Sequence, residues 1–253
     1  MNLTREQMLA EMGITPIWRL RDSPVAAAGA EDDTARAASG QRELVDTTTV
    51  SAAQDVAVDG LDWPDLAVRV GQCRACALGG QRKQAVLGIG DLDPDWLFIG
   101  EGPGAEEDIK GEPFVGQAGK LLDNMLAALG IARGRKVYIG NAVKCRPPGN
   151  RTPEAAEMAA CRPWLERQIA LLKPKVIVLL GKAAVHSVLH DDSSLASLRG
   201  QRFEYQGIPV VVTYHPAYLL RNLPEKAKAW EDLLFARRCL RETLATGGGE
   251  LPF

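Results

Sequence analysis

The sequence predicts an α/β protein in which a central four-stranded parallel sheet lies between two layers of helices. Two observations support this three-layer αβα class. Four runs are apolar and rich in β-branched residues without alternating polar positions, which is typical of parallel strands covered on both faces. Segments with helical periodicity separate these runs, and such alternation of strand and helix favours a layered α/β domain.

The expected elements follow one another from about residue 62 onward. Strands are predicted at 95–100, 136–141, 175–181 and 208–214. Helices are predicted at 62–72, 117–130, 153–171, 182–189 and 224–244. Pro153 directly follows Thr152, which predicts a helix start with threonine as the N-cap and proline at the first helical position.

The region before this domain has a different character. Residues 3–14 are predicted to form a short amphipathic helix, with Thr4 and Gln7 as a capping box. Residues 22–60 are rich in Ala, Asp, Gly, Ser and Thr, which is typical of a flexible linker. We therefore expect four segments: an N-terminal helix region at 1–21, an acidic linker at 22–61, a globular domain at 62–246 and a tail at 247–253. The N-terminal helix is a candidate for binding a protein partner.

Bulk composition narrows the class of protein. The chain has 253 residues, 46% of them hydrophobic, which is ordinary for a globular protein. It has neither an apolar run of roughly 18 residues nor a signal peptide, so we expect no membrane association and a cytoplasmic location, at the nucleoid in a prokaryotic cell. Residues 1–65 hold 5 Lys/Arg and 12 Asp/Glu, whereas residues 66–253 hold 25 and 20. This asymmetry fits either a solvated acidic tail or a basic face that meets phosphates.

Polar and aromatic residues follow three of the predicted strands. Gly100, Glu101 and Phe114 lie in the segment GEGPGAEEDIKGEPFVG after the first strand, Asn141 ends the second, and His215 follows the last. The carboxyl ends of parallel strands meet at one edge of a sheet, where α/β proteins bind ligands. A ring, an amide and an imidazole at that edge predict a pocket for a flat polar molecule.

Four cysteines have the spacing of a metal site. Cys73 and Cys76 form a CxxC pair, and Cys145 and Cys161 follow as single residues. Four thiolates can hold a tetrahedral zinc ion or an iron–sulfur cluster, and the local spacing does not separate the two. A disulfide or a thioredoxin-like role is disfavoured, since there is no export signal and CxxC does not open a helix after a strand. Cys239, in the last apolar helix, is expected in the core.

From about residue 66 to 244 the chain resembles the family 4 uracil-DNA glycosylases, the branch that carries a 4Fe–4S cluster. The matching segments are CRAC, GEGPGAEEDIKGEPFVGQAGKLLDNML, VYIGNAVKCRPPGNRTP, the helix with Cys161, KVIVLLGKAA and YHPAYLLRN. They occur in order and cover nearly three quarters of the chain. The resemblance implies a structural 4Fe–4S cluster on Cys73, Cys76, Cys145 and Cys161. It also implies a uracil site of Gly100, Glu101, Gly102, Glu107, Phe114, Asn141 and His215.

The implied reaction suits these residue types. A glycosylase extrudes the nucleotide from the duplex into a pocket, where Phe114 can stack on the base. The Asn141 amide can accept from uracil N3–H and donate to O4, a pattern that cytosine reverses. His215 can stabilise the departing base anion by donating to O2. The simpler alternatives are core packing for Phe114, a turn role for Asn141 and a capping role for His215, whereas His186 and His190 are expected to be structural or exposed.

The water-activating group is less well defined by the motif. The better-known family 1 enzymes have an aspartate just before the motif proline, where this chain has Gly102. Glu101 is the nearest carboxylate, so we expect Glu101 and His215 to be the catalytic pair. Glu107 is expected to position the base or to exclude the thymine methyl group.

DNA contacts are expected from two segments. Apolar side chains of Leu219 and Leu220 can fill the gap left by a flipped base, and Arg221 can meet a phosphate. Beside a cluster ligand, Lys144, Arg146 and Arg151 are candidates for backbone contacts. The expected partner is uracil-containing DNA, bound by a monomer.

Two other functions compete with a monofunctional hydrolase. One is a non-catalytic nucleic-acid-binding module that carries a cluster or zinc and belongs to replication or repair machinery. The other is the related branch that traps DNA covalently through a histidine in a basic insert, but no histidine lies between Asn141 and Cys161. A lyase is disfavoured because Lys110 and Lys120, the lysines nearest to the motif, lack the apolar setting of a Schiff-base lysine.

Overall fold

The computed structural model describes residues 58–246, and the expected segments 1–21 and 247–253 and most of 22–61 lie outside them. One six-stranded sheet forms the centre, in the order β1-β3-β2-β4-β6-β5. Its strands are β1 (Ile89–Gly90), β2 (Trp96–Gly100), β3 (Val137–Asn141), β4 (Val176–Leu180), β5 (Arg202–Tyr205) and β6 (Ile208–Thr213). The helices and 3-10 turns are η1 (Val58–Gly60), α2 (Trp63–Gln72), α3 (Leu78–Gln81), α4 (Ala105–Lys110), α5 (Gln117–Ala128), η2 (Pro148–Asn150), α6 (Ala155–Leu172), α7 (Lys182–Leu189), α8 (Leu195–Leu198), α9 (Pro216–Arg221) and α10 (Glu225–Thr246).

The four predicted strands are confirmed as β2, β3, β4 and β6, and they pair in parallel. Two antiparallel edge strands, β1 and β5, enlarge the expected sheet of four to six. The short β1 has two residues, and β5 alternates exposed Arg202 and Glu204 with half-buried side chains. A two-residue turn with positive φ at Gln206 and Gly207 connects β5 to β6. Such turns match the twist of hairpin strands, so this dipeptide marks the hairpin that the apolar pattern does not reveal.

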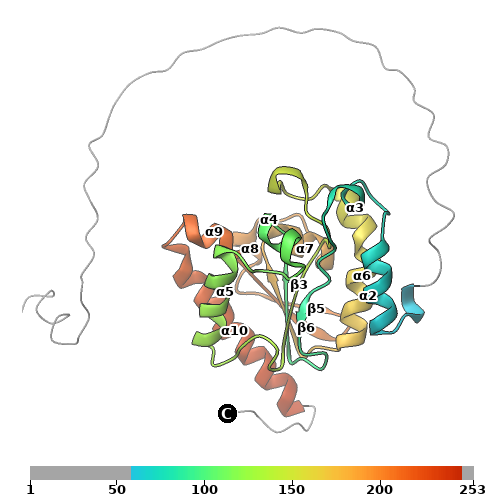
Figure 1. The fold of residues 1–253 in the computed structure, drawn as a ribbon. Helices are drawn as coiled ribbons and strands as arrows, with labels where there is room; N and C mark the ends of the chain where they lie inside the picture. Colours follow the sequence, from blue (N-terminus) through green and yellow to red (C-terminus); the bar gives the residue numbers. More distant parts are fainter. Residues whose placement is uncertain (1–57, 247–253) are drawn as a thin grey trace, which may run out of the picture. The chain divides into compact units, whose positions relative to one another are not determined.

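Helices cover both faces of the sheet, which confirms the three layers. Alternate residues of β2 point to opposite faces, because successive strand side chains alternate. Trp96 and Phe98 pack with α5 and α10, whereas Leu97 and Ile99 pack with α6 and α7. Figure 1 shows α5 and α10 on one side of the sheet and α6, with α2 outside it, on the other. Among the described helices, none combines the length and apolar character that crossing a bilayer requires.

One helix boundary differs from the expected one. Helix α6 begins at Ala155, and its N-cap is Glu154 rather than Thr152. The backbone N–H of Glu154 donates to Glu157 Oε2 at 2.8 Å, and the two glutamates form a capping box. Thr152 therefore stays in the preceding loop, which leads toward the carboxyl ends of the strands.

Candidate functional site

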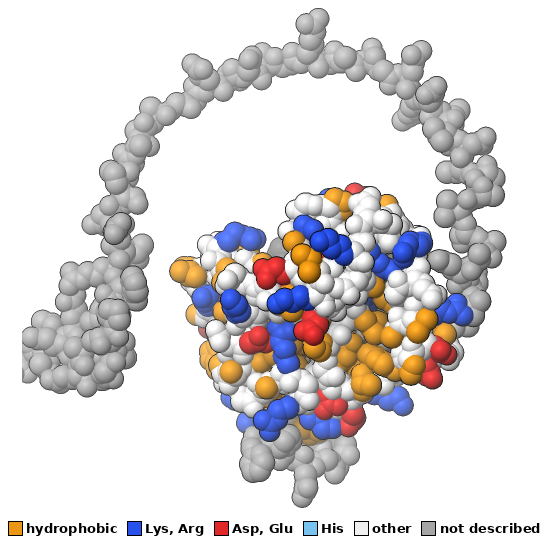
Figure 2. Space-filling view, viewed as in Figure 1, with side chains coloured by type: hydrophobic (Ala, Val, Ile, Leu, Met, Phe, Trp, Pro, Cys, Tyr) orange, Lys and Arg blue, Asp and Glu red, His pale blue; other side chains and the backbone are white. Residues whose placement is uncertain are grey.

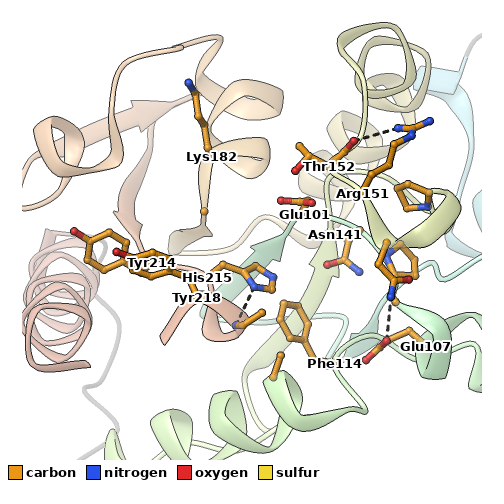
Figure 3. Close-up of a pocket in the computed structure, with 18 of the residues that line it drawn as sticks. Glu101, Glu107, Phe114, Asn141, Arg151, Thr152, Lys182, Tyr214, His215 and Tyr218 are labelled. Atoms are coloured by element: carbon orange, nitrogen blue, oxygen red, sulfur yellow. Dashed lines mark hydrogen bonds between the residues drawn. The ribbon is translucent and has the colours of Figure 1, made fainter. Parts of the chain in front are cut away.

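A cavity of about 660 Å³ opens where the four parallel strands end. Glu101 and Gly102 come from the end of β2, Gly181 from β4, and His215 from β6, while Asn141 is the last residue of β3. The chain leaves β2 for β3 on one side and then crosses to β4 on the other, so the cavity lies at a topological switch point. Figure 3 shows side chains from these separate strand ends pointing into one space.

One carboxylate, that of Glu107, accepts three backbone hydrogen bonds within the segment between β2 and α5. Glu107 Oε1 accepts from the N–H groups of Val115 and Gly116, at 2.9 and 3.1 Å. Its Oε2 accepts from the N–H of Gly104 at 3.1 Å. Both oxygens thus pin backbone on either side of Phe114, whose φ of 55° is rare for a bulky residue. Glu107 lines the cavity as expected, and its hydrogen bonds give it a supporting role for the Phe114 loop.

Gly100 brings the aromatic ring and the amide together. In the parallel register, Gly100 lies beside Asn141. A Cβ added at Gly100 would come within 2.5 Å of the Phe114 ring and 2.6 Å of Asn141 Oδ1. Only glycine therefore allows both side chains to approach this strand end. Asn141 is 2% exposed, and its Oδ1 is buried without a hydrogen-bond partner among the described residues.

His215 forms the wall next to Phe114. Their rings stack with centroids 5.4 Å apart and 28° between planes, so they make one continuous aromatic surface. His215 is also the N-cap of α9, and its Nδ1 accepts from the N–H of Ala217 at 3.2 Å. In the neutral ring this bond places the proton on Nε2. Burial lowers the pKa of His215 to about 4, with a smaller contribution from the charge of Arg221.

Glu101 is the carboxylate of the cavity that burial affects most clearly. Burial raises the pKa of Glu101, and a hydrogen bond from the side chain of Thr152 partly opposes this. Arg151, from the same loop, donates to both oxygens of Glu157, at 2.8 and 2.7 Å. A carboxylate with an elevated pKa in a cleft is a candidate proton acceptor.

Several lining residues were not anticipated from the sequence. They are Thr152, Lys182, Tyr214 and Tyr218, with Asn150, Leu195 and small residues around them. The lysine at the cavity is Lys182 rather than Lys110 or Lys120, because it lies two residues after the end of β4. The rule that strand ends meet at one edge could have identified Lys182, since its strand was predicted correctly. Tyr214 and Tyr218 flank His215 in sequence, which is the signal that was available for them.

Comparison with known proteins agrees with this arrangement. The sequence profile of the Uracil DNA glycosylase superfamily matches residues 87–234. The Type-4 uracil-DNA glycosylase of Thermotoga maritima is 48% identical over 156 residues, which are 61% of this chain and 81% of that protein. The Type-4 enzyme of Pyrobaculum aerophilum is 40% identical over 183 residues, covering 68% of this chain and 92% of the relative. This chain belongs to family 4 of the uracil-DNA glycosylases. A Type-5 uracil-DNA glycosylase of the same organism is 32% identical over 149 residues, 53% of this chain and 66% of its own length.

In this family 4 protein, the four expected cysteines gather around one small cavity. Cys73, Cys76, Cys145 and Cys161 all line it, although they come from separate segments. Arg82 donates to Cys145 Sγ at 2.8 Å and to the carbonyls of Val70, Gly71 and Cys73, at 3.0, 2.7 and 3.2 Å. The N–H of Lys144 donates to Cys161 Sγ at 3.3 Å. N–H donors directed at sulfur suit thiolate ligands, so the residues fit a cluster. Cys239 is buried in the α10 core, as expected.

Four cysteines that line one cavity can hold either a tetrahedral zinc ion or an iron–sulfur cluster, because thiolates bind both groups.

Two of the expected DNA contacts are wrong. Lys144 is 1% exposed, and its Nζ donates to the carbonyl oxygen of Asn141 at 2.7 Å. Leu219 is also 1% exposed and packs in a small core with Tyr214 and Ala229. Lys144 lies between buried cysteines, and Leu219 faces inward on the short helix α9. Neither side chain reaches a surface where DNA can bind.

The other expected contact residues lie nearer to solvent. Arg151 and Arg221 line the cavity, and Leu220 is 41% exposed. Arg146 lies outside the cavity lining, and its Nε donates to Asn150 Oδ1 at 2.7 Å. Figure 2 shows one face of the molecule, and over its middle Lys and Arg side chains lie close to Asp and Glu side chains.

Proposed function

We propose that this chain hydrolyses the N-glycosidic bond of deoxyuridine in DNA, releases uracil and leaves an abasic site for base excision repair. The observation that carries the proposal is the buried, unpartnered Oδ1 of Asn141 beside the Phe114–His215 rings. A buried polar atom without a partner in a native protein calls for an explanation. The N3–H of uracil supplies the missing donor. The names of the family 4 relatives, Type-4 uracil-DNA glycosylase, support the same substrate.

The Asn141 amide reads the base. With Oδ1 accepting from N3–H, its Nδ2 donates to the O4 of uracil. Cytosine presents an acceptor at N3 and an amino donor at the neighbouring carbon, so both hydrogen bonds would be lost. Sites of this kind reject the mismatched analogue strongly because their own buried polar groups are left unpaired.

Phe114 and His215 receive the extruded base. The nucleotide must leave the stack, because its glycosidic bond is unreachable inside the duplex. Since the two rings already contact each other, the base lies against the surface that they share rather than in a slot between them. Stacking there replaces the contacts that uracil loses on leaving the helix.

His215 stabilises the departing anion as a neutral donor. Its Nδ1 is occupied by the Ala217 N–H, so Nε2–H is the group that can donate to uracil O2. As the bond from C1′ to N1 breaks, negative charge moves onto the base and its O2. A donor held in place before the reaction stabilises that charge without reorganisation.

Glu101 accepts a proton from the attacking water. The water oxygen forms a bond to C1′ while its proton passes to the carboxylate, and the bonding pair of the glycosidic bond leaves with uracil. The negative carboxylate also stabilises positive charge on the sugar. Gly102 offers no alternative, because glycine has no side chain that could accept a proton.

The enzyme is monofunctional in this proposal. Lys182 is exposed at the cavity rim, which is not the desolvated setting of a Schiff-base lysine. Cys73, Cys76, Cys145 and Cys161 hold a 4Fe–4S cluster that ties α6 to the segments before β2 and after β3. Bound to four thiolates, this group supplies structural cross-linking. We further propose that the protein acts as a monomer on uracil-containing DNA.

Incubation of the full chain with a labelled oligonucleotide containing one deoxyuridine tests the function. Strand cleavage is expected only after alkali, which breaks abasic sites, and only when uracil rather than cytosine or thymine is present. Cleavage before alkali would contradict the monofunctional assignment. If the protein carries its full metal content and binds the strand without releasing uracil, the non-catalytic binding module replaces this proposal.

A further inference from the structure

Two tyrosines in the cavity have no role in reading or releasing uracil. Tyr214 and Tyr218 both line it, and their rings stack with centroids 5.0 Å apart and 30° between planes. Tyr214 is 9% exposed, whereas Tyr218 is 37% exposed. Figure 3 shows the pair on the side of His215 away from Phe114 and Asn141. An aromatic surface therefore continues beyond the proposed uracil pocket.

A buried ion pair holds the inner ring of this stack. The Arg199 guanidinium lies 4.7 Å from the centroid of the Tyr214 ring, a cation–π distance. Arg199 Nε and Nη2 donate to the Asp232 carboxylate at 2.6 and 3.0 Å. Thr213 Oγ1 donates to the same carboxylate at 2.7 Å, and Asp232 is 3% exposed. These hydrogen bonds fix the position of the Arg199 guanidinium against the Tyr214 ring.

The size and charge of the cavity also exceed the needs of one base. Its volume of about 660 Å³ lies in the range of pockets that enclose drug-sized ligands. Lys182 and Arg221 line it, and neither forms an ion pair with any residue from 58 to 246. Cations without acidic partners beside an aromatic surface are typical of sites that bind single-stranded nucleic acid.

We propose that Tyr218, supported by Tyr214, is a second stacking site, for the nucleobase adjacent to the extruded deoxyuridine. Extruding one nucleotide leaves its neighbour with an uncovered face. Stacking on Tyr218 covers that face, while Arg221 and Lys182 bind the flanking phosphates. The inference rests on the proposed function, since it takes the base in the main pocket to be uracil from a DNA strand.

Affinity for modified single strands tests the stacking site. The deoxyuridine in each strand carries a 2′-fluorine, which slows cleavage because it destabilises the sugar cation. Fluorescence anisotropy then measures the affinity of the full chain for the intact strand. The strand is compared with two others in which an abasic spacer replaces the base on the 5′ or the 3′ side. We expect the wild type to bind one of the two spacer strands about tenfold more weakly than the intact strand. A loss of this size lies within the range measured for stacking one base.

Variants at Tyr218 locate the contact. Tyr218→Ala should lose about tenfold on the intact strand and nothing further with the spacer, whereas Tyr218→Phe, which keeps the ring, should behave as wild type. Val68→Ala, at a 56% exposed position of α2, controls for a general surface change. The proposal would be overturned if neither the 5′ nor the 3′ spacer lowered the affinity of the wild type. It would also be overturned if the spacer lowered the affinity of Tyr218→Ala by the same factor as that of the wild type.

Failure of this inference is separable from failure of the proposed function. Release of uracil from an unmodified strand reports on the main pocket alone. Uracil release without any spacer effect would reject the stacking site and keep the glycosylase. The wild-type spacer comparison needs no variant, so it remains decisive even if Tyr218→Ala does not fold.

Discussion

Gly119 packs directly against the backbone of Phe114. A Cβ added at Gly119, in the first turn of α5, would come within 1.7 Å of the Phe114 carbonyl oxygen. The same carbonyl accepts from Arg133 Nη2 at 2.6 Å, and Pro113 O accepts from Arg133 Nη1 at 2.9 Å. The position of the stacking ring therefore depends on a glycine that lies outside the cavity lining.

Gly119→Ala is expected to displace Phe114 and to slow uracil excision by about 100-fold, because misplacement by about 1 Å can cost that much. Overpacking should also lower the free energy of unfolding by about 1–3 kcal/mol. Single-turnover uracil release and urea unfolding measure the two effects. Gly71→Ala is the control, since a Cβ there meets nothing within 4 Å. Equal activity of both variants would show that the Phe114 loop tolerates movement.

Asn141→Asp is expected to slow uracil excision by about 5- to 150-fold, the cost of one mispaired buried hydrogen bond at about 1–3 kcal/mol. An ionised carboxylate would place an acceptor opposite uracil O4, which is itself an acceptor, so this hydrogen bond would be lost. Burial would raise the pKa of the new carboxyl group. The relative rate on cytosine should rise. Asn124→Asp makes the same chemical change at an exposed position of α5 and should leave excision intact. Unchanged uracil excision by Asn141→Asp would refute the base-reading role.

His215→Ala is expected to slow cleavage by about 100- to 1,000-fold, as for loss of a donor to a developing anion. Binding to a non-hydrolysable deoxyuridine strand should fall much less, because the charge on the base develops only during cleavage. Rates and affinities measured on the same strand give the comparison. Equal losses in rate and affinity would show that His215 mainly supports the α9 cap.

The pH dependence follows from the lowered pKa of His215. With a pKa of about 4 in the folded protein, the ring stays neutral from pH 8 to 5, so protonation of His215 should not change the cleavage rate there. In the unfolded chain the ring binds a proton near pH 6.5. Its contribution to stability is therefore complete above pH 6.5 and falls by about 3 kcal/mol as the pH drops to 4. A cleavage rate that rises as pH falls through 6.5 would instead indicate an imidazolium acid.

Cys145→Ala is expected to lose iron, the brown colour and stability, because three thiolates hold a cluster less tightly than four. Elemental analysis and the visible spectrum of the purified protein measure this. Cys239→Ala removes a buried cysteine of α10 that lies outside the four-cysteine cavity, and it should keep its iron. Zinc in place of iron, or iron retained by Cys145→Ala, would contradict the assignment.

The strands on which the site depends could be predicted from the sequence, because the pattern of apolar residues that identifies them lies within a few neighbouring positions. Unbroken apolar runs ending in Asn141 and before His215 identified parallel strands, and such strands can end only at a shared edge. The β5 strand was missed because its exposed Arg202 and Glu204 resemble a loop, and its pairing with β6 makes it a strand. Lys144 and Leu219 were misassigned because composition does not show which way a side chain faces.

The sequence alone determined the α/β class, the residues at the strand ends, the four cysteines and the family resemblance. Each depends on residue type and on spacing along the chain. Tertiary structure alone decided that Lys144 bonds to Asn141 inside the protein, that Glu107 holds the Phe114 loop, and that Tyr214 and Tyr218 extend the cavity. These relationships depend on which side chains packing brings together and which it withdraws from water, and no local pattern encodes that burial.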